Sequence, residues 1–349
     1  MNFDHPKGVV FGAGAVGGSV GAWVARHTND TLRFVARPPN GAILRERGVT
    51  LYSQDAPEQK TTVPVRVVDS LDDIDNVGEV DFILLAVKNY HLDAVAARIK
   101  EKFGDGPIIV AMQNGVENQR ILPAYFSKVI YCIVSYNAWT DAPGVIGYQK
   151  HGPLYLGTLD NSLSAETRAI AALLNRGVPT YVTDRLGDAA HSKLVLNLSN
   201  SLTTLIGLGV REIKNRRLFQ KLLTTMIWEG IRIIKAAGYR EVKLGGMPPW
   251  IKLWMGAHLP HIITRPIFEN GVKKMVISSM AQDVLQRGGT QSELESLNGY
   301  LLALADRHGI DAPYNRSIYA LCKKEFAKEG FTPLDIEEVW RVVRAGQVG

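Results

Sequence analysis

Cysteine is scarce in this sequence, with only Cys132 and Cys322 among 349 residues. Both stand among apolar neighbours and far apart in the chain, which argues against a disulfide framework and for reduced, buried thiols in a cytoplasmic protein. No group of Cys and His residues has the spacing of metal ligands. We therefore expect no metal.

Long apolar runs and targeting signals are missing as well. No segment approaches the roughly 18 apolar residues of a membrane-spanning helix, and the first residues lack the basic start and cleavage site of a secretory signal. The net charge of +6 suits a small anionic ligand, but the basic residues are scattered, which argues against nucleic acid. We expect a cytoplasmic monomer or homodimer with no membrane or nucleic-acid partner.

The first half of the chain alternates short apolar runs with helical patterns. A run such as Phe82–Val87 is apolar throughout, as in a buried parallel strand. The alternation predicts an α/β domain with a doubly wound sheet over residues 1–185. Strands are expected at Gly8–Phe11, Leu32–Ala36, Val63–Val68, Asp81–Val87, Pro107–Met112 and Lys128–Val134, with Gly152–Gly157 and Thr180–Val182 at the far edge; helices are expected at Val16–Arg26, Leu92–Lys100 and Ala165–Leu174.

Long helical patterns dominate after Asp184. They predict an all-α second domain over residues 186–349. The stretch Gly245–Pro266 contains four prolines within an apolar segment and is expected to be irregular. The predicted helices are Ala189–Ile206, Arg216–Ala237, Val272–Gln286, Glu293–His308 and Arg316–Lys328.

A glycine-rich segment joins the first predicted strand to the first predicted helix. In the pattern G-x-G-x-x-G, the first glycine permits a tight turn, the second lets backbone approach a pyrophosphate, and the third allows close helix–sheet packing. The N–H groups at the start of the helix can then bind the anion. The expected cofactor-binding residues are Gly12, Ala13, Gly14, Ala15, Val16 and Gly17.

The end of the second predicted strand indicates which dinucleotide binds. An NAD site usually places an acidic residue there for the ribose 2′-hydroxyl, but this sequence has Phe34-Val35-Ala36-Arg37. A guanidinium can pair with a 2′-phosphate through two hydrogen bonds. Arg37 therefore favours NADP over NAD, the alternative being a solvated loop arginine.

Two further loops follow buried strands at the edge where a nicotinamide lies in such folds. Lys88 can reach ribose or phosphate oxygens, and Asn114 can hydrogen-bond ribose, nicotinamide or substrate. A surface lysine and an ordinary Asn-Gly turn explain the two residues equally well from the sequence alone.

One helical pattern in the second half carries polar residues in an apolar background. At about 100° per residue, Asn197 lies about 40° from Lys193, and Asn200 lies about 20° to the other side. Reduction of a 2-oxo carbon creates an alkoxide that needs a proton donor and a cation, and Lys193 can be both. An exposed lysine with asparagines on the solvent side is the equally weighted alternative.

A second polar set follows downstream. Ser279 can bind a substrate carboxylate, and Glu293 can orient the substrate and tune Lys193. Physical chemistry alone favours helix caps for the glutamates, because Thr290-x-x-Glu293 and Ser292-x-x-Glu295 both match the capping box.

The ordered set of motifs resembles the ketopantoate reductase (2-dehydropantoate 2-reductase) family. The resemblance implies an N-terminal Rossmann domain, a C-terminal helical domain and an active site between them. It also implies reduction of 2-dehydropantoate to pantoate by NADPH, a step toward pantothenate and coenzyme A. The segments that carry it are Gly12–Gly17, Ala86-Val87-Lys88, Gln113-Asn114-Gly115, Lys193-x-x-x-Asn197, Ser278–Asp283, and Glu293 with Leu297-Asn298-Gly299.

The resemblance also assigns roles to single residues. Lys193 is implied as the general acid, and Glu293 as a residue that assists catalysis and holds the substrate. The remaining implied residues are Asn114, Asn197 and Ser279 for the substrate, and Arg37 and Lys88 near the cofactor.

Three features depart from the family pattern. The second asparagine usually falls eight residues after the lysine, but here Asn200 falls at seven and Ser201 at eight, about 100° away on a regular helix. Asn200 stays a candidate for substrate binding, with Ser201 as its alternative. The link from Ser279 to the glutamate is two residues longer than usual, so that Glu295 rivals Glu293. The stretch Gly245–Pro266 has no counterpart and is a candidate wall of the substrate pocket.

Two other functions stay open on the sequence. A related NAD(P)-dependent dehydrogenase would act on another 2-oxo acid or on an opine-type imino acid, and the unusual stretch Gly245–Pro266 favours it. A non-catalytic NADP-binding sensor would need only the glycine loop, so the presence of both Lys193 and Glu293 argues against it.

Overall fold

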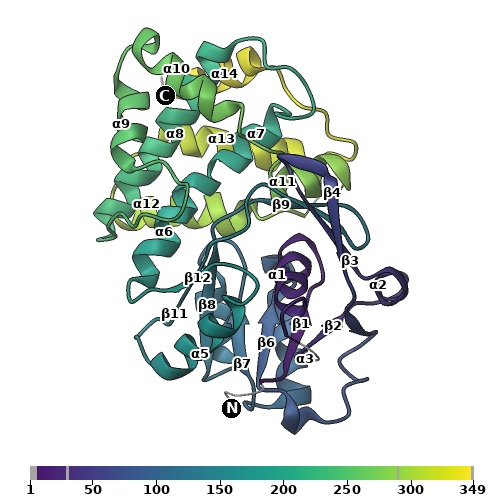
Figure 1. The fold of residues 1–349 in the computed structure, drawn as a ribbon. Helices are drawn as coiled ribbons and strands as arrows, with labels where there is room; N and C mark the ends of the chain where they lie inside the picture. The colour runs from purple at the N-terminus through teal and green to yellow at the C-terminus, as the bar shows by residue number, and fades with distance from the viewer. Residues whose placement is uncertain (1–5, 29–30, 289–290, 347–349) are drawn as a thin grey trace. The chain divides into compact units, whose positions relative to one another are not determined.

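The chain forms two compact units, Met1–Leu186 and Gly187–Gly349, each with its own apolar core. The computed structural model describes residues 6–28, 31–288 and 291–346. An eight-stranded sheet forms the centre of the first unit (Figure 1), in the order β12-β11-β8-β7-β6-β1-β2-β5. The strands are β1 Gly8–Phe11, β2 Leu32–Val35, β5 Arg66–Val68, β6 Phe82–Leu85, β7 Ile108–Ala111, β8 Val129–Val134, β11 Leu154–Gly157 and β12 Thr180–Val182.

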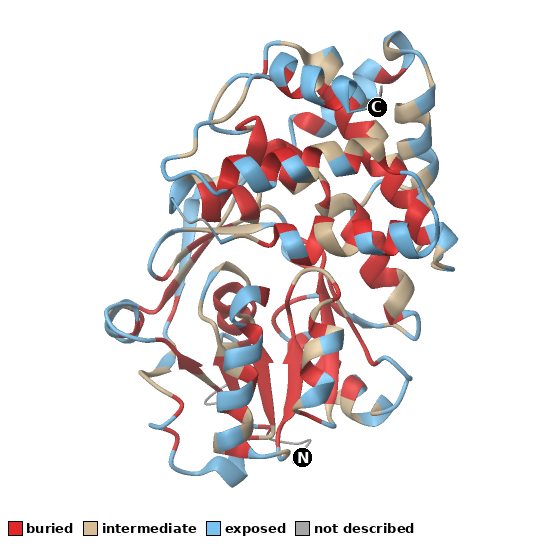
Figure 2. Ribbon diagram, turned by 180° about the vertical axis from the view of Figure 1, so that it is seen from behind, coloured by how far each residue is buried: buried red, intermediate tan, exposed pale blue. Residues whose placement is uncertain are grey.

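This sheet is doubly wound. All its neighbouring strands are parallel except β8 and β11. From β1 the chain crosses to β2 in one direction, and from β6 it crosses to β7 in the other. Right-handed crossovers therefore put helices α1 (Ala15–Ala25) and α3 (Asn89–Phe103) on opposite faces. Strands β6 and β7 are buried along their whole length (Figure 2), as their apolar sequences predict.

A second, four-stranded sheet of the first unit was not predicted. Its order is β4-β3-β10-β9, and α1 contacts both this sheet and β1. Six consecutive residues of the longest strand are exposed, so the apolar signal that reveals a buried strand is absent. The strands are β3 Val49–Ser53, β4 Ala56–Val63, β9 Ala138–Ala142 and β10 Val145–Tyr148.

Two smaller predictions for this unit need correction. Val63–Val68 is not one strand, because Val63 ends β4 of the small sheet and β5 of the large sheet begins at Arg66. Pro64 lies between them and has no N–H to donate to a ladder. A short helix, α2 (Asn40–Arg47), also follows β2. The remaining helical segments of the unit are η1 Val77–Glu79, α4 Asn118–Ile121, η2 Leu122–Ala124 and α5 Ser164–Leu174.

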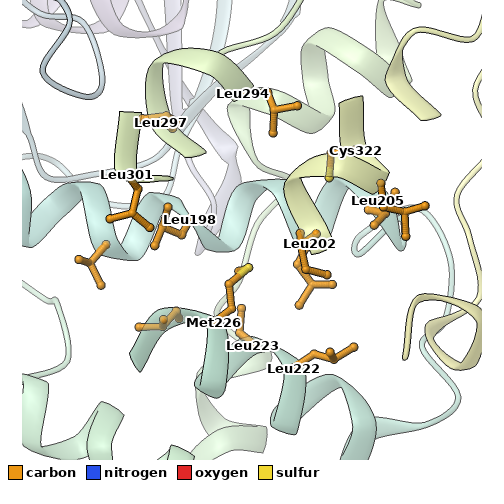
Figure 3. Packing of buried hydrophobic residues seen from close by; sticks show 14 of the residues in the cluster. Leu198, Leu202, Leu205, Leu222, Leu223, Met226, Leu294, Leu297, Leu301 and Cys322 are labelled. Carbon is orange, nitrogen blue, oxygen red and sulfur yellow. The ribbon is translucent and has the colours of Figure 1, made fainter. Parts of the chain in front are cut away.

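The second unit is helical, so that the predicted fold class, an α/β doubly wound sheet followed by an all-α region, is confirmed. Helices α6 and α7 pack by leucines against α8 and against the segment around Leu297 (Figure 3). The elements are α6 Leu186–Asn197, α7 Ser199–Leu205, α8 Arg216–Ala236, α9 Trp250–His258, α10 His261–Val272, α11 Ser279–Ala281, η3 Gln282–Gln286, η4 Glu295–Gly299, α12 Tyr300–Arg307, α13 Pro313–Phe326 and α14 Ile336–Ala345.

The stretch Gly245–Pro266 is irregular only at its start, up to Pro249, and is helical over most of its remaining length, contrary to the prediction. Pro249 and Pro260 take the N-cap positions of α9 and α10, where a missing N–H breaks no helical hydrogen bond. Only Pro266 lies inside a helix. Pro249 and Pro260 therefore mark where helices start and do not interrupt them.

The predicted helix Val272–Gln286 is also wrong. Helix α10 ends at Val272, and a turn and an extended segment separate it from α11. The π-helical η3 follows α11 directly, and a second π-helical turn, η4, opens the region predicted as the helix Glu293–His308. Such turns are frequent at functional sites.

Candidate functional site

The glycine loop takes the conformation that its sequence predicts. Phe11 ends β1, and Gly12 follows with φ of 101°, a left-handed conformation that favours glycine. A Cβ on Gly17 would lie 2.2 Å from the carbonyl oxygen of Gly12, so the third glycine is required by the packing of α1 on the loop.

Gly14 has a different reason to be glycine. It is the N-cap of α1 with φ of −78°, and a Cβ built there meets no atom within 4 Å. The fold itself therefore tolerates a side chain at this position. No side chain caps the first turn of α1 among the described residues. The open space and the N–H groups of the first turn fit the close approach of a pyrophosphate.

Arg37 lies just beyond β2, the neighbour of β1 in the sheet. The side chain is exposed, and within 6–28, 31–288 and 291–346 no carboxylate pairs with it. A guanidinium without an internal partner at this strand end is suited to an added anion.

The loops after β6 and β7 are joined by buried amides. Asn89 donates a 2.7 Å hydrogen bond from Nδ2 to the carbonyl of Asn114, and Gln113 donates from Nε2 to the carbonyl of Leu85 at 2.7 Å. Asn118 in turn donates to Oε1 of Gln113 at 3.3 Å. These contacts fix the backbone that carries Asn114 and the N-cap of α3, Lys88, both of which are half-buried. These positioning amides were not predicted from the sequence, although Gln113 lies within a motif segment and Asn89 directly follows one.

Lys193 and Asn197 lie one turn apart on α6, and both are half-buried. The Nδ2 atom of Asn197 is buried and has no hydrogen-bond partner among the described residues. A buried amide donor without a partner is costly, so its position is suited to a ligand that accepts a hydrogen bond.

Asn200 and Ser201 differ in their surroundings. The helix is interrupted at Leu198, between α6 and α7. Ser201 is fully buried, and its Oγ donates to the carbonyl of Leu198 at 2.8 Å and accepts from Nδ2 of Asn298 at 3.1 Å. Asn200 is half-buried, and its carbonyl accepts from the hydroxyl of Thr203. Ser201 is thus engaged inside the helical unit.

Two adjacent serines at the start of α11 have separate roles. Ser278 is the N-cap, and its Oγ accepts from the backbone N–H of Ala281 at 3.1 Å. Ser279 is half-buried and is left out of this cap. The hydroxyl of Ser279 is therefore not needed to cap the N-terminus of α11.

The two rival glutamates are also distinguished. Glu293 is 3% exposed, whereas the carboxylate of Glu295 lies at the surface, 2.7 Å from the hydroxyl of Tyr319 and 3.1 Å from Nζ of Lys323. The hydrogen bond from Tyr319 holds the pKa of Glu295 below its ordinary value. Glu295 therefore does not close the predicted capping box with Ser292, whose Oγ accepts instead from the backbone N–H of Leu294 at 3.4 Å. Thr290, the other predicted cap, lies outside the described residues.

Within residues 6–28, 31–288 and 291–346, no helix combines the length and apolar character needed to cross a bilayer. The same part of the chain contains no group of three His, Cys, Asp or Glu side chains arranged to hold a metal ion.

The sheet order and the glycine loop define a Rossmann-type fold joined to a helical unit. Two family models match, "Ketopantoate reductase PanE/ApbA" over residues 9–161 and its C-terminal counterpart over residues 186–325. The chain therefore belongs to the ketopantoate reductase family of oxidoreductases, and the resemblance predicted from the motifs is confirmed.

Individual relatives agree with this assignment. The 2-dehydropantoate 2-reductase of Archaeoglobus fulgidus is 25% identical over 316 residues, 90% of this chain and 96% of the relative. A PanE/ApbA family ketopantoate reductase from Ralstonia eutropha has a TM-score of 0.70 at 24% identity, with 97% and 99% of the chains covered. D-mandelate dehydrogenase, solved with NADH and anilino(oxo)acetate, has a TM-score of 0.74 at 16% identity, with 91% and 98% covered.

Proposed function

We propose that the chain reduces 2-dehydropantoate to pantoate with NADPH, a step toward pantothenate and coenzyme A. The family match across both units supports this proposal, because the matched ranges include both the segment of the glycine loop and the segment of Lys193. In the proposed division of labour, residues 1–185 bind the cofactor and residues 186–349 bind and protonate the substrate.

The cofactor residues are proposed to be the loop Gly12–Gly17 for the pyrophosphate, Arg37 for the 2′-phosphate of NADPH, and Lys88 and Asn114 for ribose and nicotinamide. The open space at Gly14 supports this assignment. When bound, a reduced nicotinamide supplies the hydride for the 2-oxo carbon.

The substrate residues are proposed to act on the two ends of a 2-oxo acid. Lys193 donates a proton to the 2-oxo oxygen as that oxygen becomes a hydroxyl, and its positive charge stabilises the developing alkoxide. Glu293 holds and orients the substrate. The other proposed contacts are Asn114, Asn197, Asn200 and Ser279, of which Ser279 binds the carboxylate.

Lys193→Ala tests the chemistry. We expect NADPH oxidation in the presence of 2-dehydropantoate to fall by about 10²–10⁴ in kcat, because the proton donor is lost. Lys235→Ala, which removes an exposed lysine of α8 in the same unit, is the matched control and is expected to keep its rate. An unchanged rate in Lys193→Ala would remove Lys193 as the acid.

Arg37→Ser tests the choice of dinucleotide. Loss of a charge-assisted pair with the 2′-phosphate is expected to raise the KM for NADPH about ten- to hundredfold and to leave the KM for NADH unchanged. Arg47→Ser, a change of an exposed arginine on α2, serves as the control. Equal effects on both dinucleotides would show that Arg37 does not read the phosphate.

A second candidate is a dehydrogenase for a bulkier 2-oxo acid or an imino acid. The helices α9 and α10 of the stretch Gly245–Pro266, together with the fold shared with D-mandelate dehydrogenase, favour it. Turnover should be compared across a panel of 2-oxo acids, with and without amines. A clear preference for 2-dehydropantoate would remove this candidate, and NADPH binding without any turnover would favour a sensor.

A further inference from the structure

A histidine and a tyrosine join α6 to α12 inside the helical unit. His191 is 2% exposed, and burial lowers its pKa to about 4, so the ring is neutral at pH 7. Its Nδ1 lies 2.7 Å from the carbonyl of Gly187, which only accepts, so Nδ1 carries the proton. Nε2 then accepts from the hydroxyl of Tyr300 at 2.8 Å. Tyr239 stacks on the imidazole, with ring centroids 3.5 Å apart.

A serine and an asparagine make a second junction. Ser201 and Asn298 are both fully buried, and Nδ2 of Asn298 donates to Oγ of Ser201 at 3.1 Å. The same Oγ donates to the carbonyl of Leu198, the residue between α6 and α7. Asn298 lies in the π-helical turn η4, directly before α12. The two junctions therefore connect α6–α7 to one continuous helical segment.

The junctions are well separated along α6–α7. His191 and Ser201 are ten residues apart, which corresponds to about 15 Å of helix. Lys193 and Asn197 lie between them in the sequence. Around the helix axis, Ser201 lies about 80° and His191 about 160° from Lys193 on a regular helix. The junctions therefore occupy neighbouring faces of the helix, both of them away from the direction of Lys193.

Leucine packing alone would not fix this helix. Leu198 contacts the same apolar cluster as Leu297 and Leu301 (Figure 3), and such contacts tolerate small rotations and shifts because they are non-directional. Buried hydrogen bonds are directional, and breaking them leaves polar atoms without partners. Two such hydrogen bonds at different positions along the helix axis fix both the rotation of the helix and its position along that axis.

We propose that these two junctions act as a clamp that sets the direction of the Lys193 side chain, with Tyr300 and Asn298 as positioning residues for the proton transfer. The clamp rests on the proposed function in so far as Lys193 is the acid. The π-helical turn η4 carries Asn298, and Tyr300 is the first residue of α12 directly after it, so that both positioning residues belong to one helical segment.

Two substitutions test the clamp in the full-length enzyme. Tyr300→Phe removes only the hydroxyl that His191 accepts, and Ser201→Ala removes only the oxygen that Asn298 contacts. Each is expected to lower kcat about ten- to hundredfold with the KM for NADPH unchanged, and to shift the limb of the pH–kcat profile that depends on Lys193. Ser201→Thr keeps a hydroxyl and is expected to restore most of the rate.

The control is Tyr125→Phe, which also removes a hydrogen-bonded tyrosine hydroxyl, here 2.9 Å from Asp93 in the first unit. It is expected to leave both kcat and the pH profile unchanged. If Tyr300→Phe and Ser201→Ala behave like this control, the clamp does not position Lys193 and the inference is wrong.

A readout without turnover separates this outcome from a failure of the proposed function. Lysines can be labelled by reductive methylation with ¹³C, and the signal of Lys193 is identified by its loss in Lys193→Arg. The clamp predicts that the chemical shift and titration of this signal change in Tyr300→Phe and Ser201→Ala, but not in Tyr125→Phe. An unchanged signal overturns the clamp even if the wild-type enzyme reduces no 2-oxo acid tested. Wild-type inactivity with a shifted signal contradicts only the proposed reaction.

Discussion

At the scale of single residues, Gly17 of the glycine loop is needed for packing, whereas Gly14 is proposed to be needed for cofactor binding. A Cβ at Gly17 would collide with the carbonyl of Gly12, whereas a Cβ at Gly14 would meet nothing. Gly14→Ala is therefore expected to leave the free energy of unfolding within about 0.5 kcal/mol of the wild type. It is expected to weaken NADPH binding at least about tenfold, because the methyl group occupies the space of the pyrophosphate.

Gly17→Ala is the matched comparison, measured by urea unfolding and by NADPH titration. It is expected to lower the free energy of unfolding by about 1–3 kcal/mol, because the loop or α1 must shift. If Gly14→Ala bound NADPH as tightly as the wild type, the loop would not be the pyrophosphate site.

At the scale of elements, the two serines at the start of helix α11 are expected to differ, one in stability and the other in substrate binding. Ser278 caps it, so Ser278→Ala is expected to cost about 1 kcal/mol of stability. Ser279 makes no cap, so Ser279→Ala is expected to be neutral in urea unfolding and to raise the KM for the 2-oxo acid about tenfold or more, through loss of a hydrogen bond to its carboxylate. If the KM for the 2-oxo acid rose in Ser278→Ala and not in Ser279→Ala, the substrate contact would have to be assigned to Ser278.

The elements that the sequence predicted correctly are those with a strong local signal. Strands β6 and β7 are apolar throughout, and α8 begins at Arg216 as expected, after the cap of Asn215, whose side chain accepts from Leu218. The small sheet carries no such signal, because β4 is exposed on both faces. Its strands are recognised only by their pairing with distant segments, such as β10 with β3.

The errors in the second unit have two causes. A proline can interrupt a helix or stand at its start, and the sequence does not distinguish the two cases; Pro249 and Pro260 stand where helices start. The π-helical turns η3 and η4 depend on one extra residue per turn, which a 3.6-residue periodicity does not reveal. For the same reason the sequence does not predict the contact of Asn298 with Ser201, although Asn298 lies in a motif and Ser201 is the alternative to Asn200.

At the scale of the whole molecule, the separate cores of the two units predict separate folding. Val10 and Leu84 belong to one apolar cluster, and Leu198 and Met226 belong to the other. A fragment of residues 1–186 is therefore expected to fold alone, to show native-like circular dichroism and to bind NADPH. At a concentration of 100 Kd, NADPH is expected to stabilise that fragment by about 2.7 kcal/mol.

The same fragment is expected to show no turnover with any 2-oxo acid, because Lys193 and Glu293 belong to the second unit. The rate of the fragment should therefore lie below that of the full-length Lys193→Ala variant, since the fragment also lacks Asn197 and Ser279. NADPH binding by residues 187–349 alone, or turnover by residues 1–186, would contradict the division of labour between cofactor and proton donor. Calorimetry of the whole chain with and without NADPH completes the test. If NADPH binds only to the first unit, it must raise the unfolding temperature of that unit directly.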